Sequence, residues 1–224
     1  MQIFNCYTPS WFSGMAISLE LLFAIVTMLI ALFAYRAYKV VQERDVLLFG
    51  IAFFSIGLGY LQEVIYNASQ LFSLTRYSLS PIIGPVANTM NIGFMVALIH
   101  MITFIFGLSL LVYLILPRRN KKLFVIIAGL GLIGLFTSSN IVLTFFLINS
   151  LMLLALTLHY YQLFLKKNSK SSLYNFIGFG SIFLGQLQLA IATQEFSTLY
   201  IASHITTLFG FILLLLNLFR VMRK

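Results

Sequence analysis

Four side chains that can carry charge stand inside otherwise apolar stretches of this sequence: Glu20, Glu63, His100 and His204. An ionisable side chain such as Asp or Lys at the centre of a bilayer costs roughly 2.5–3.5 kcal/mol on insertion scales, so such positions are functional candidates by default. Two amide side chains occupy comparable positions. The candidate ligand-binding residues are therefore Glu20, Glu63, His100, Asn149, Gln188 and His204.

These groups are compatible with several chemistries. Glu20, Glu63, His100 and His204 together could hold zinc or iron, and the two histidines alone could ligate a b-type haem across a bundle. A pocket for a small ligand or lipid headgroup needs no special spacing, and proton-coupled transport would also use such groups. Because the sequence contains no H-E-x-x-H, no paired ligand spacing and no internal repeat, it predicts neither a cofactor nor a catalytic residue.

A structural role is the alternative for the uncharged members of the set. Asn, Gln, Thr and His side chains often join membrane helices through hydrogen bonds worth about 0.6–2 kcal/mol each. This role is expected for Asn149, Gln186, Gln188 and Thr207. His159, beside Tyr160 and Tyr161, is expected at the membrane interface.

The composition requires lipid as the solvent. Of the 224 residues, 61% are hydrophobic and only 8% are charged, whereas a soluble domain has about 25% charged residues. A chain with so few charges could not cover a surface that faces water. We therefore expect an all-α membrane protein that forms one polytopic domain over residues 1–224.

Seven stretches are long and apolar enough to be membrane helices. A span needs roughly 20 mainly apolar residues. The expected helices cover residues 11–35, 46–66, 92–116, 123–137, 141–165, 173–193 and 198–219. The fourth is short for a span and could instead be a re-entrant or surface segment.

The basic residues predict an orientation. The formal net charge is +9, and of the 14 Lys and Arg all but Arg76 follow the first, third, fifth or seventh expected helix. Cytoplasmic loops of membrane proteins collect Lys and Arg. This pattern places the N-terminus outside and the C-terminus in the cytoplasm of a multi-pass cell-membrane protein, and it requires the short fourth helix to cross. The positive charge thus reflects topology, and no nucleic-acid partner is expected.

Several membrane functions are excluded by residue type. No lysine lies within an expected span, so a retinal Schiff base cannot form. The only aspartate, Asp45, lies in an expected cytoplasmic loop, which removes an intramembrane aspartyl dyad and a Ser-His-Asp triad. The only cysteine is Cys6, so no intrachain disulfide is possible, and the sequence has no phosphate-binding Gly-rich loop.

The candidate residues should lie at one depth and face the bundle interior. At 1.5 Å per residue, each lies roughly 23–26 Å above the cytoplasmic end of its helix. Residues spaced by three or four share a helix face, and on four helices the candidates share that face with small residues, which mark close packing in membranes. The stripes are Glu20, Ala24, Thr27, Ala31 and Ala34; Ala52, Ser55, Gly59 and Glu63; His100, Thr103 and Gly107; and Gly178, Ser181, Gly185 and Gln188.

One long outer loop is expected between the second and third helices, at residues 67–91. Pro81 and Pro85 prevent a continuous helix there, and the apolar content of "SPIIGPVANTM" suggests that the loop covers the mouth of the bundle.

Two segments carry a family resemblance. "AYRAYKVVQERDVLLFGIAFFSIGLGYL", residues 34–61, resembles the junction of the first two helices in small seven-helix membrane proteins common in archaea. "LYIASHITTLFGFILLLLNLFRVMRK", residues 199–224, is similar to the last helix of the same group. The layout also resembles the membrane-embedded sensor region of histidine kinases, which precedes a signalling domain. The resemblance implies the fold and membrane residence and carries over no site residues.

The residues and the resemblance together favour a membrane protein that senses or binds a small ligand in an outward-facing polar pocket. We expect the lipid bilayer and a cytoplasmic signalling protein as its partners. An intramembrane metal- or haem-dependent enzyme, or a proton-coupled transporter, would use the same polar layer.

Overall fold

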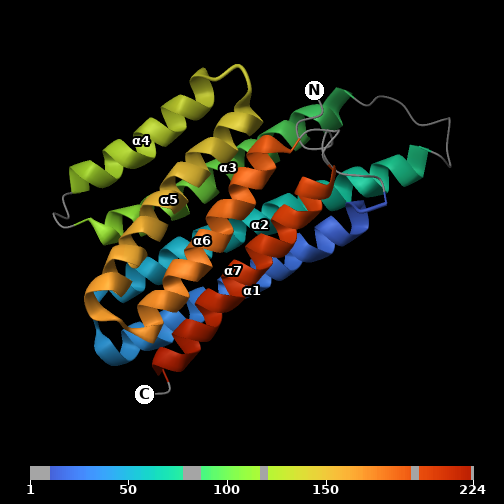
Figure 1. The fold of residues 1–224 in the computed structure, drawn as a ribbon. Coiled ribbons are helices and arrows are strands. Elements are labelled where there is room, and N and C mark those ends of the chain that lie inside the picture. The colour runs from blue at the N-terminus through green and yellow to red at the C-terminus, as the bar shows by residue number, and fades with distance from the viewer. Residues whose placement is uncertain (1–10, 78–86, 117–120, 193–196, 223–224) are drawn as a thin grey trace.

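The computed structural model describes residues 11–77, 87–116, 121–192 and 197–222. Within these residues the protein is all-α, and its helices run side by side in one elongated bundle (Figure 1). In chain order the helices are α1 (Ser13–Val41), α2 (Arg44–Tyr77), α3 (Ala87–Ile115), α4 (Lys121–Thr137), α5 (Ile141–Lys167), α6 (Lys170–Ile191) and α7 (Ser197–Met222).

The expected loop at residues 67–91 is partly helical, so this prediction was wrong at both ends. Helix α2 continues to Tyr77 and α3 begins at Ala87. Residues 67–77 contain neither Gly nor Pro, so nothing in that segment interrupts the backbone hydrogen bonds of the helix. Pro81 and Pro85, with the predicted cover over the bundle mouth, lie outside the described residues.

Five helices in the described part of the chain are long and apolar enough to cross a membrane. They are α1, α2 as far as Ala68, α3 from Phe94, α5, and α7 between Thr198 and Val221. This pattern fits an integral membrane protein. Helix α4 is shorter, with 17 residues, and would span about 26 Å along its axis.

Six helices close into a cycle that we call the central bundle. Helix α1 packs against α2 and α7, α2 against α3, α3 against α5, α5 against α6, and α6 against α7. Helix α4 lies outside this cycle, and of the described helices it contacts only α3 and α5 (Figure 1). The central bundle therefore has an interior to which six helices, but not α4, can contribute side chains.

The interior is aromatic and the outside is aliphatic. Phe23, Phe53, Phe104, Phe145 and Phe211 are between 1% and 3% exposed. The outer faces carry leucine, isoleucine and valine side chains, many of them more than half exposed, such as Leu151 on α5 and Leu130 on α4. Such an apolar exterior would be costly in water and is suited to contact with lipid acyl chains.

Small residues allow neighbouring helices to approach closely. On α1 the predicted stripe of Ala24, Thr27, Ala31 and Ala34 is buried. On α6, a Cβ atom added to Gly185 would lie 2.9 Å from the backbone oxygen of Ser203 on α7. These contacts follow the packing of small residues at helix interfaces in membranes.

The connections α1–α2 and α5–α6 leave the helices through left-handed residues. Gln42 and Asn168 have φ of 56° and 45°, and their backbone N–H groups donate to the oxygens of Tyr38 and Phe164, each at 2.7 Å. This geometry satisfies an otherwise unpaired carbonyl at each helix end.

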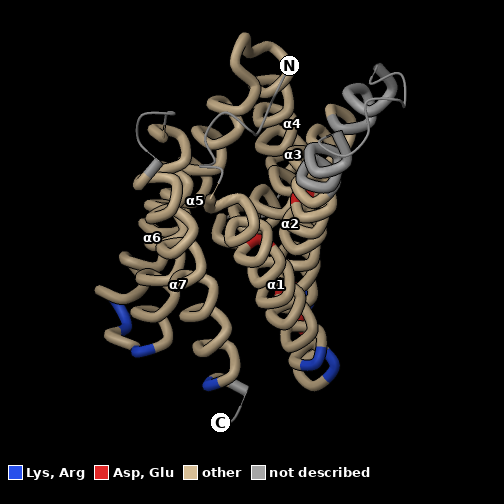
Figure 2. Tube along the Cα trace, turned by 90° about the vertical axis from the view of Figure 1, so that its right-hand side faces the viewer, with Lys and Arg blue, Asp and Glu red and all other residues tan. Residues whose placement is uncertain are grey.

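The lysines and arginines drawn in Figure 2 gather at one end of the molecule. That end holds the α1–α2 and α5–α6 connections and the last turn of α7, and we call it the basic end. The N-terminus of α1 and the α4–α5 connection lie at the other end (Figures 1 and 2). The axis of the bundle thus carries a strong charge asymmetry.

Candidate functional site

A polar cavity of about 50 Å³ lies inside the central bundle. All six helices of the bundle contribute to its wall, and α4 contributes none. Its lining consists of Glu20, Phe23, Tyr60, Glu63, Asn67, His100, Phe104, Val142, Phe145, Phe146, Gln186, Leu189, Tyr200, His204 and Thr207. A water molecule needs roughly 10–15 Å³ by this kind of measure, so the cavity has room for about four non-hydrogen atoms.

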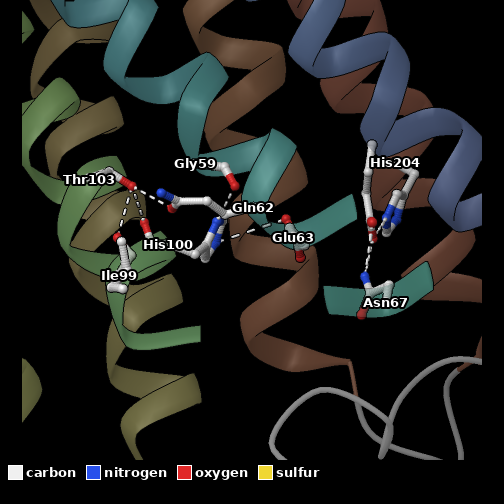
Figure 3. A network of polar contacts seen from close by, with 9 residues as sticks. Gly59, Gln62, Glu63, Asn67, Ile99, His100, Thr103 and His204 are labelled. Atoms are coloured by element: carbon white, nitrogen blue, oxygen red, sulfur yellow. Dashed lines mark hydrogen bonds and ion pairs between the residues drawn. The ribbon is translucent and has the colours of Figure 1, made fainter. Parts of the chain in front are cut away.

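Glu20 of α1 is the most buried charge-bearing group at the cavity, with 1% of its surface exposed. Asn67 of α2 donates from its Nδ2 to both carboxylate oxygens, at 2.9 Å and 2.8 Å (Figure 3). The Nε2 atom of His204, on α7, lies 4.0 Å from Oε1 of Glu20. Three helices are therefore tied together at this carboxylate.

The orientation of the His204 imidazole is fixed on its other side. Its Nδ1 lies 2.9 Å from the backbone oxygen of Tyr200, one turn earlier on α7. A carbonyl oxygen only accepts hydrogen bonds, so Nδ1 carries the hydrogen. The rings of Phe23 and Tyr200 pack against the imidazole, with centroids at 5.9 Å and 4.6 Å. His204 thus presents Nε2 to Glu20.

A second pair repeats this arrangement on α2 and α3. The Nε2 atom of His100 lies 3.9 Å from Oε2 of Glu63, and its Nδ1 lies 2.8 Å from the backbone oxygen of Gly59, which again requires an Nδ1–H donor (Figure 3). Beside this pair, the Thr103 hydroxyl donates to Oε1 of Gln62 at 3.1 Å. These contacts fix α2 against α3 at the level of the cavity.

An aromatic layer separates the cavity from the basic end. Phe23, Tyr60 and Phe104 lie three or four residues from Glu20, Glu63 and His100, always in the direction of the basic end. Ring centroids are 5.1 Å apart for Phe23 and Tyr60 and 5.3 Å apart for Tyr60 and Phe104.

Two further rings extend the aromatic layer across the bundle. Phe145 of α5 lies 5.7 Å from Phe104, and Phe211 of α7 lies 5.9 Å from Phe23, measured between centroids. Packed rings from five helices therefore separate the polar groups at the cavity from the basic end.

Two polar atoms at the cavity wall have no hydrogen-bond partner among the described residues. They are the hydroxyl oxygen of Tyr60 and Oε1 of Gln186, and both side chains are more than nine-tenths buried. Buried polar atoms nearly always pair with protein, water or ligand. The cavity is thus a place where a hydrogen-bonding molecule would be stabilised.

Four of the six predicted site residues meet at the cavity, namely Glu20, Glu63, His100 and His204. Asn149 is fully buried on α5, four residues beyond Phe145 toward the basic end, and does not line the cavity. Neither polar atom of its side-chain amide has a described partner. Asn149 therefore neither lines the cavity nor forms a hydrogen bond to another described helix.

Gln188 also lies away from the cavity wall, although it belongs to the predicted stripe on α6. The stripe faces the adjacent helix: a Cβ atom on Gly178 would come within 3.2 Å of the Gly210 oxygen on α7. Small residues lie where two helices touch. The stripe on α6 therefore points toward α7 and not toward the centre of the bundle. Gln186, expected to join helices, reaches the cavity instead.

Three further polar residues line the cavity that were not predicted from the sequence, namely Tyr60, Asn67 and Tyr200. A signal existed for two of them. Tyr60 and Asn67 stand three residues before and four residues after Glu63, on the same helix face. Asn67 was overlooked because the second helix was expected to end at residue 66, so its amide was assigned to a loop.

The carboxylates and imidazoles are arranged as two Glu–His pairs, Glu20 with His204 and Glu63 with His100. In the described part of the chain, no three His, Cys, Asp or Glu side chains are grouped in an arrangement that could hold a metal ion. The zinc or iron ligand set of Glu20, Glu63, His100 and His204 and the haem ligation by the two histidines remain predictions.

Comparison of the chain with protein-family models, with curated proteins and with solved structures finds no match. The functional interpretation therefore depends on the geometry of the cavity.

Proposed function

We propose that this protein is a seven-helix membrane receptor that binds a small polar ligand in the cavity of its central bundle. The observation that carries the proposal is the convergence of polar side chains from α1, α2, α3, α6 and α7 on one enclosed space. Within it, Tyr60 and Gln186 offer buried polar atoms without a described partner. Concave sites with a few convergent polar groups are typical of ligand binding.

In this proposal all seven helices cross the cell membrane and the basic end faces the cytoplasm. The gathering of Lys and Arg at one end supports that orientation. Glu20 and His204 each stand seven residues after the first residue of their helix, or about 10 Å along the axis. The ligand would enter from the outer side, which is the nearer one.

The aromatic layer favours binding over transport. A transported molecule would have to pass from the cavity to the basic end through the packed rings of Phe23, Tyr60, Phe104, Phe145 and Phe211. A pocket closed on that side is suited to detection of a ligand and not to its passage. The small cavity also favours a ligand of few atoms over a haem.

The signal would leave through the helices that meet at the cavity. A ligand that contacts α2, α3 and α7 together can bind one arrangement of these helices more tightly than another. It then shifts the populations of the two arrangements by the ratio of its affinities for them. The connections at the basic end would present that change to a cytoplasmic partner. The resemblance to sensor regions of histidine kinases agrees with this role.

A binding screen on the unmodified protein and on a variant that lacks one hydroxyl group tests the proposal. Purified protein in lipid nanodiscs is heated with small cations, anions and neutral polar molecules of up to about six non-hydrogen atoms, chosen from the size of the cavity. We expect at least one class to raise the unfolding temperature saturably. Tyr60→Phe, which removes only the hydroxyl, should weaken the apparent affinity about 2- to 10-fold, the value of one hydrogen bond.

The matched control is Tyr161→Phe, because Tyr161 is 42% exposed on α5 and does not line the cavity. It should leave the affinity unchanged. If no class binds saturably, or if Tyr60→Phe and Tyr161→Phe behave alike, the cavity is not a ligand site.

A further inference from the structure

We propose that the molecule held in the cavity is a small protonated primary amine, bound between the Glu20–His204 and Glu63–His100 pairs. This inference rests on the proposed function and specifies its ligand class. It is carried by three observations on the cavity wall: its charge, its excess of hydrogen-bond acceptors and its aromatic surfaces.

The charge of the wall favours a cation. Its described lining residues include two carboxylates and neither a lysine nor an arginine. Among these residues, only the imidazoles of His100 and His204 could become positive. An anion placed in this space would meet both carboxylates at close range with little water between them, which is strongly unfavourable.

The hydrogen-bond roles of the imidazoles follow from their backbone partners. The Nδ1 atoms of His100 and His204 donate to carbonyl oxygens, of Gly59 and Tyr200. A neutral imidazole with hydrogen on Nδ1 has an accepting lone pair on Nε2. With both imidazoles neutral, each Nε2 faces a carboxylate oxygen, so that two acceptors face each other in both pairs.

The separations agree with a donor that bridges each pair. The two Nε2–Oε distances are 3.9 Å and 4.0 Å, longer than the roughly 2.7–2.9 Å of a hydrogen bond between an imidazolium and a carboxylate. Two acceptors about 4 Å apart can both lie about 2.8 Å from one N–H-bearing nitrogen between them. An ammonium group between such acceptors would donate an N–H to each of them and supply a compensating positive charge.

Other atoms on the wall point to a ligand that donates hydrogen bonds. Oε1 of Gln186 is an acceptor, and the Tyr60 hydroxyl can accept as well as donate; neither has a described partner. A primary ammonium offers three N–H donors, whereas a quaternary ammonium offers none. The chemistry therefore selects a primary amine among organic cations.

The aromatic side chains and the volume define the rest of the ligand. Rings of Phe23, Tyr60, Phe104 and Phe145 line the cavity and can stabilise a cation within about 6 Å of their centroids, as well as pack on a short carbon chain. A volume of about 50 Å³ corresponds to about four non-hydrogen atoms. Propylammonium has this size.

A series of probes with four or five non-hydrogen atoms each tests the proposal in nanodiscs at pH 7. Propylammonium should bind saturably and raise the unfolding temperature, because an alkylamine with a pKa like that of lysine is protonated at this pH. Its neutral counterpart 1-propanol and the donor-free tetramethylammonium should each bind at least about 10-fold more weakly. Propionate should not bind.

Charge-neutral variants locate the effect. Glu63→Gln keeps the shape of the side chain and should weaken propylammonium binding at least about 10-fold while leaving 1-propanol unaffected within about 2-fold. Glu43→Gln is the matched control, because Glu43 is exposed in the α1–α2 connection at the basic end. If Glu63→Gln does not fold, the probe series on the unmodified protein decides the question alone.

The outcomes separate this inference from the function on which it rests. If propionate or 1-propanol binds better than propylammonium, and this binding depends on Tyr60, the ligand is not an amine but the cavity is still a ligand site. If tetramethylammonium binds as tightly as propylammonium, the proposal that N–H donors of the ligand bridge each Glu–His pair is wrong. Absence of binding by any probe would overturn both proposals.

Discussion

At the residue scale, a backbone carbonyl determines what each cavity histidine can do. Gly59 and Tyr200 each accept the Nδ1 hydrogen of an imidazole, which leaves Nε2 directed toward a carboxylate. The charge of Glu20 is further stabilised by Asn67, which donates to both of its oxygens. Hydrogen bonds to a buried carboxylate are worth more than bonds between neutral groups, so Asn67 contributes to the stability of this corner of the bundle.

A double-mutant cycle on Glu20 and His204 measures whether they act as one site. Nε2 of His204 lies 4.0 Å from Oε1 of Glu20, so we expect each group to contribute to the stability of the other. Glu20→Gln and His204→Gln should each change the free energy of unfolding in detergent. The double variant should deviate from the sum by about 0.5–3 kcal/mol, the range for groups in contact.

The control for this cycle pairs Glu20→Gln with Glu43→Gln, at the opposite end of α1. That double variant should be additive within about 0.3–0.5 kcal/mol. Additivity of the Glu20 and His204 variants as well, in both detergent and lipid, would mean that each group only bonds a separate neighbour.

At the element scale, the contact between α6 and α7 is set by glycines. A Cβ atom on Gly185 would collide with the hydroxyl of Thr207, which itself lines the cavity, and one on Gly210 would lie 2.6 Å from the backbone oxygen of Gly178. Helices so close cannot accept even a methyl group without moving apart. The width of the cavity therefore depends on this contact.

Replacing Gly185 by alanine tests that dependence. We expect Gly185→Ala to lower the free energy of unfolding by about 1–3 kcal/mol through overpacking. Gly129→Ala on α4 is the matched control, because no atom lies within 4 Å of its added Cβ. That variant should be neutral or stabilising by up to about 1 kcal/mol, from helix propensity alone. Equal effects in thermal unfolding would show that the α6–α7 contact is not tight.

Helix α4 shows how one element can belong to the bundle without forming the site. It contacts α3 and α5 from outside, and side chains such as Val125 and Ile133 are at least 60% exposed. Its 17 residues span about 26 Å, slightly less than a hydrocarbon core of about 30 Å. A helix of this length can cross with modest local thinning of the bilayer.

At the scale of the whole molecule, charge and polarity are arranged along one axis. The lysines and arginines gather at the basic end (Figure 2), and the aromatic layer lies between that end and the polar groups of the cavity. A field of positive charge at the cytoplasmic surface would hold the protein in one orientation through the negative potential of that leaflet. In the proposed orientation, a ligand would reach the cavity from the outer side.

Single cysteines test this orientation in intact cells. In a Cys6→Ser background, Ser139→Cys in the α4–α5 connection should react with a membrane-impermeant maleimide from outside. Lys167→Cys and Lys122→Cys, at the ends of α5 and α4 nearest the basic end, should react only after permeabilisation, because Lys and Arg collect in the cytoplasm.

Each departure from this labelling has a distinct meaning. Reaction of Lys167→Cys from outside together with protection of Ser139→Cys would invert the orientation. External reaction of both Lys122→Cys and Ser139→Cys, with Lys167→Cys protected, would show that α4 does not cross the membrane and would reduce the number of spans.

The sequence alone determined the helical class, the membrane environment and the inward-facing residues of α1. These follow from local properties: span length, hydropathy and a spacing of three or four residues. It also identified both carboxylates and both imidazoles of the cavity, because a charged group in hydrocarbon is costly wherever its helix packs. The extent of α2 beyond residue 66 was missed, since polar residues there resembled a loop.

Only the tertiary structure decided which side chains meet. Glu20 and His204 are paired because α1 and α7 close the central bundle, and helix periodicity contains no information about that neighbour. Gln186 reaches the cavity while Gln188 does not, because the glycine stripe of α6 faces α7. A helical pattern states which residues share a face. The partner of that face depends on the order and the distances of the other helices, which are set by packing across the whole bundle.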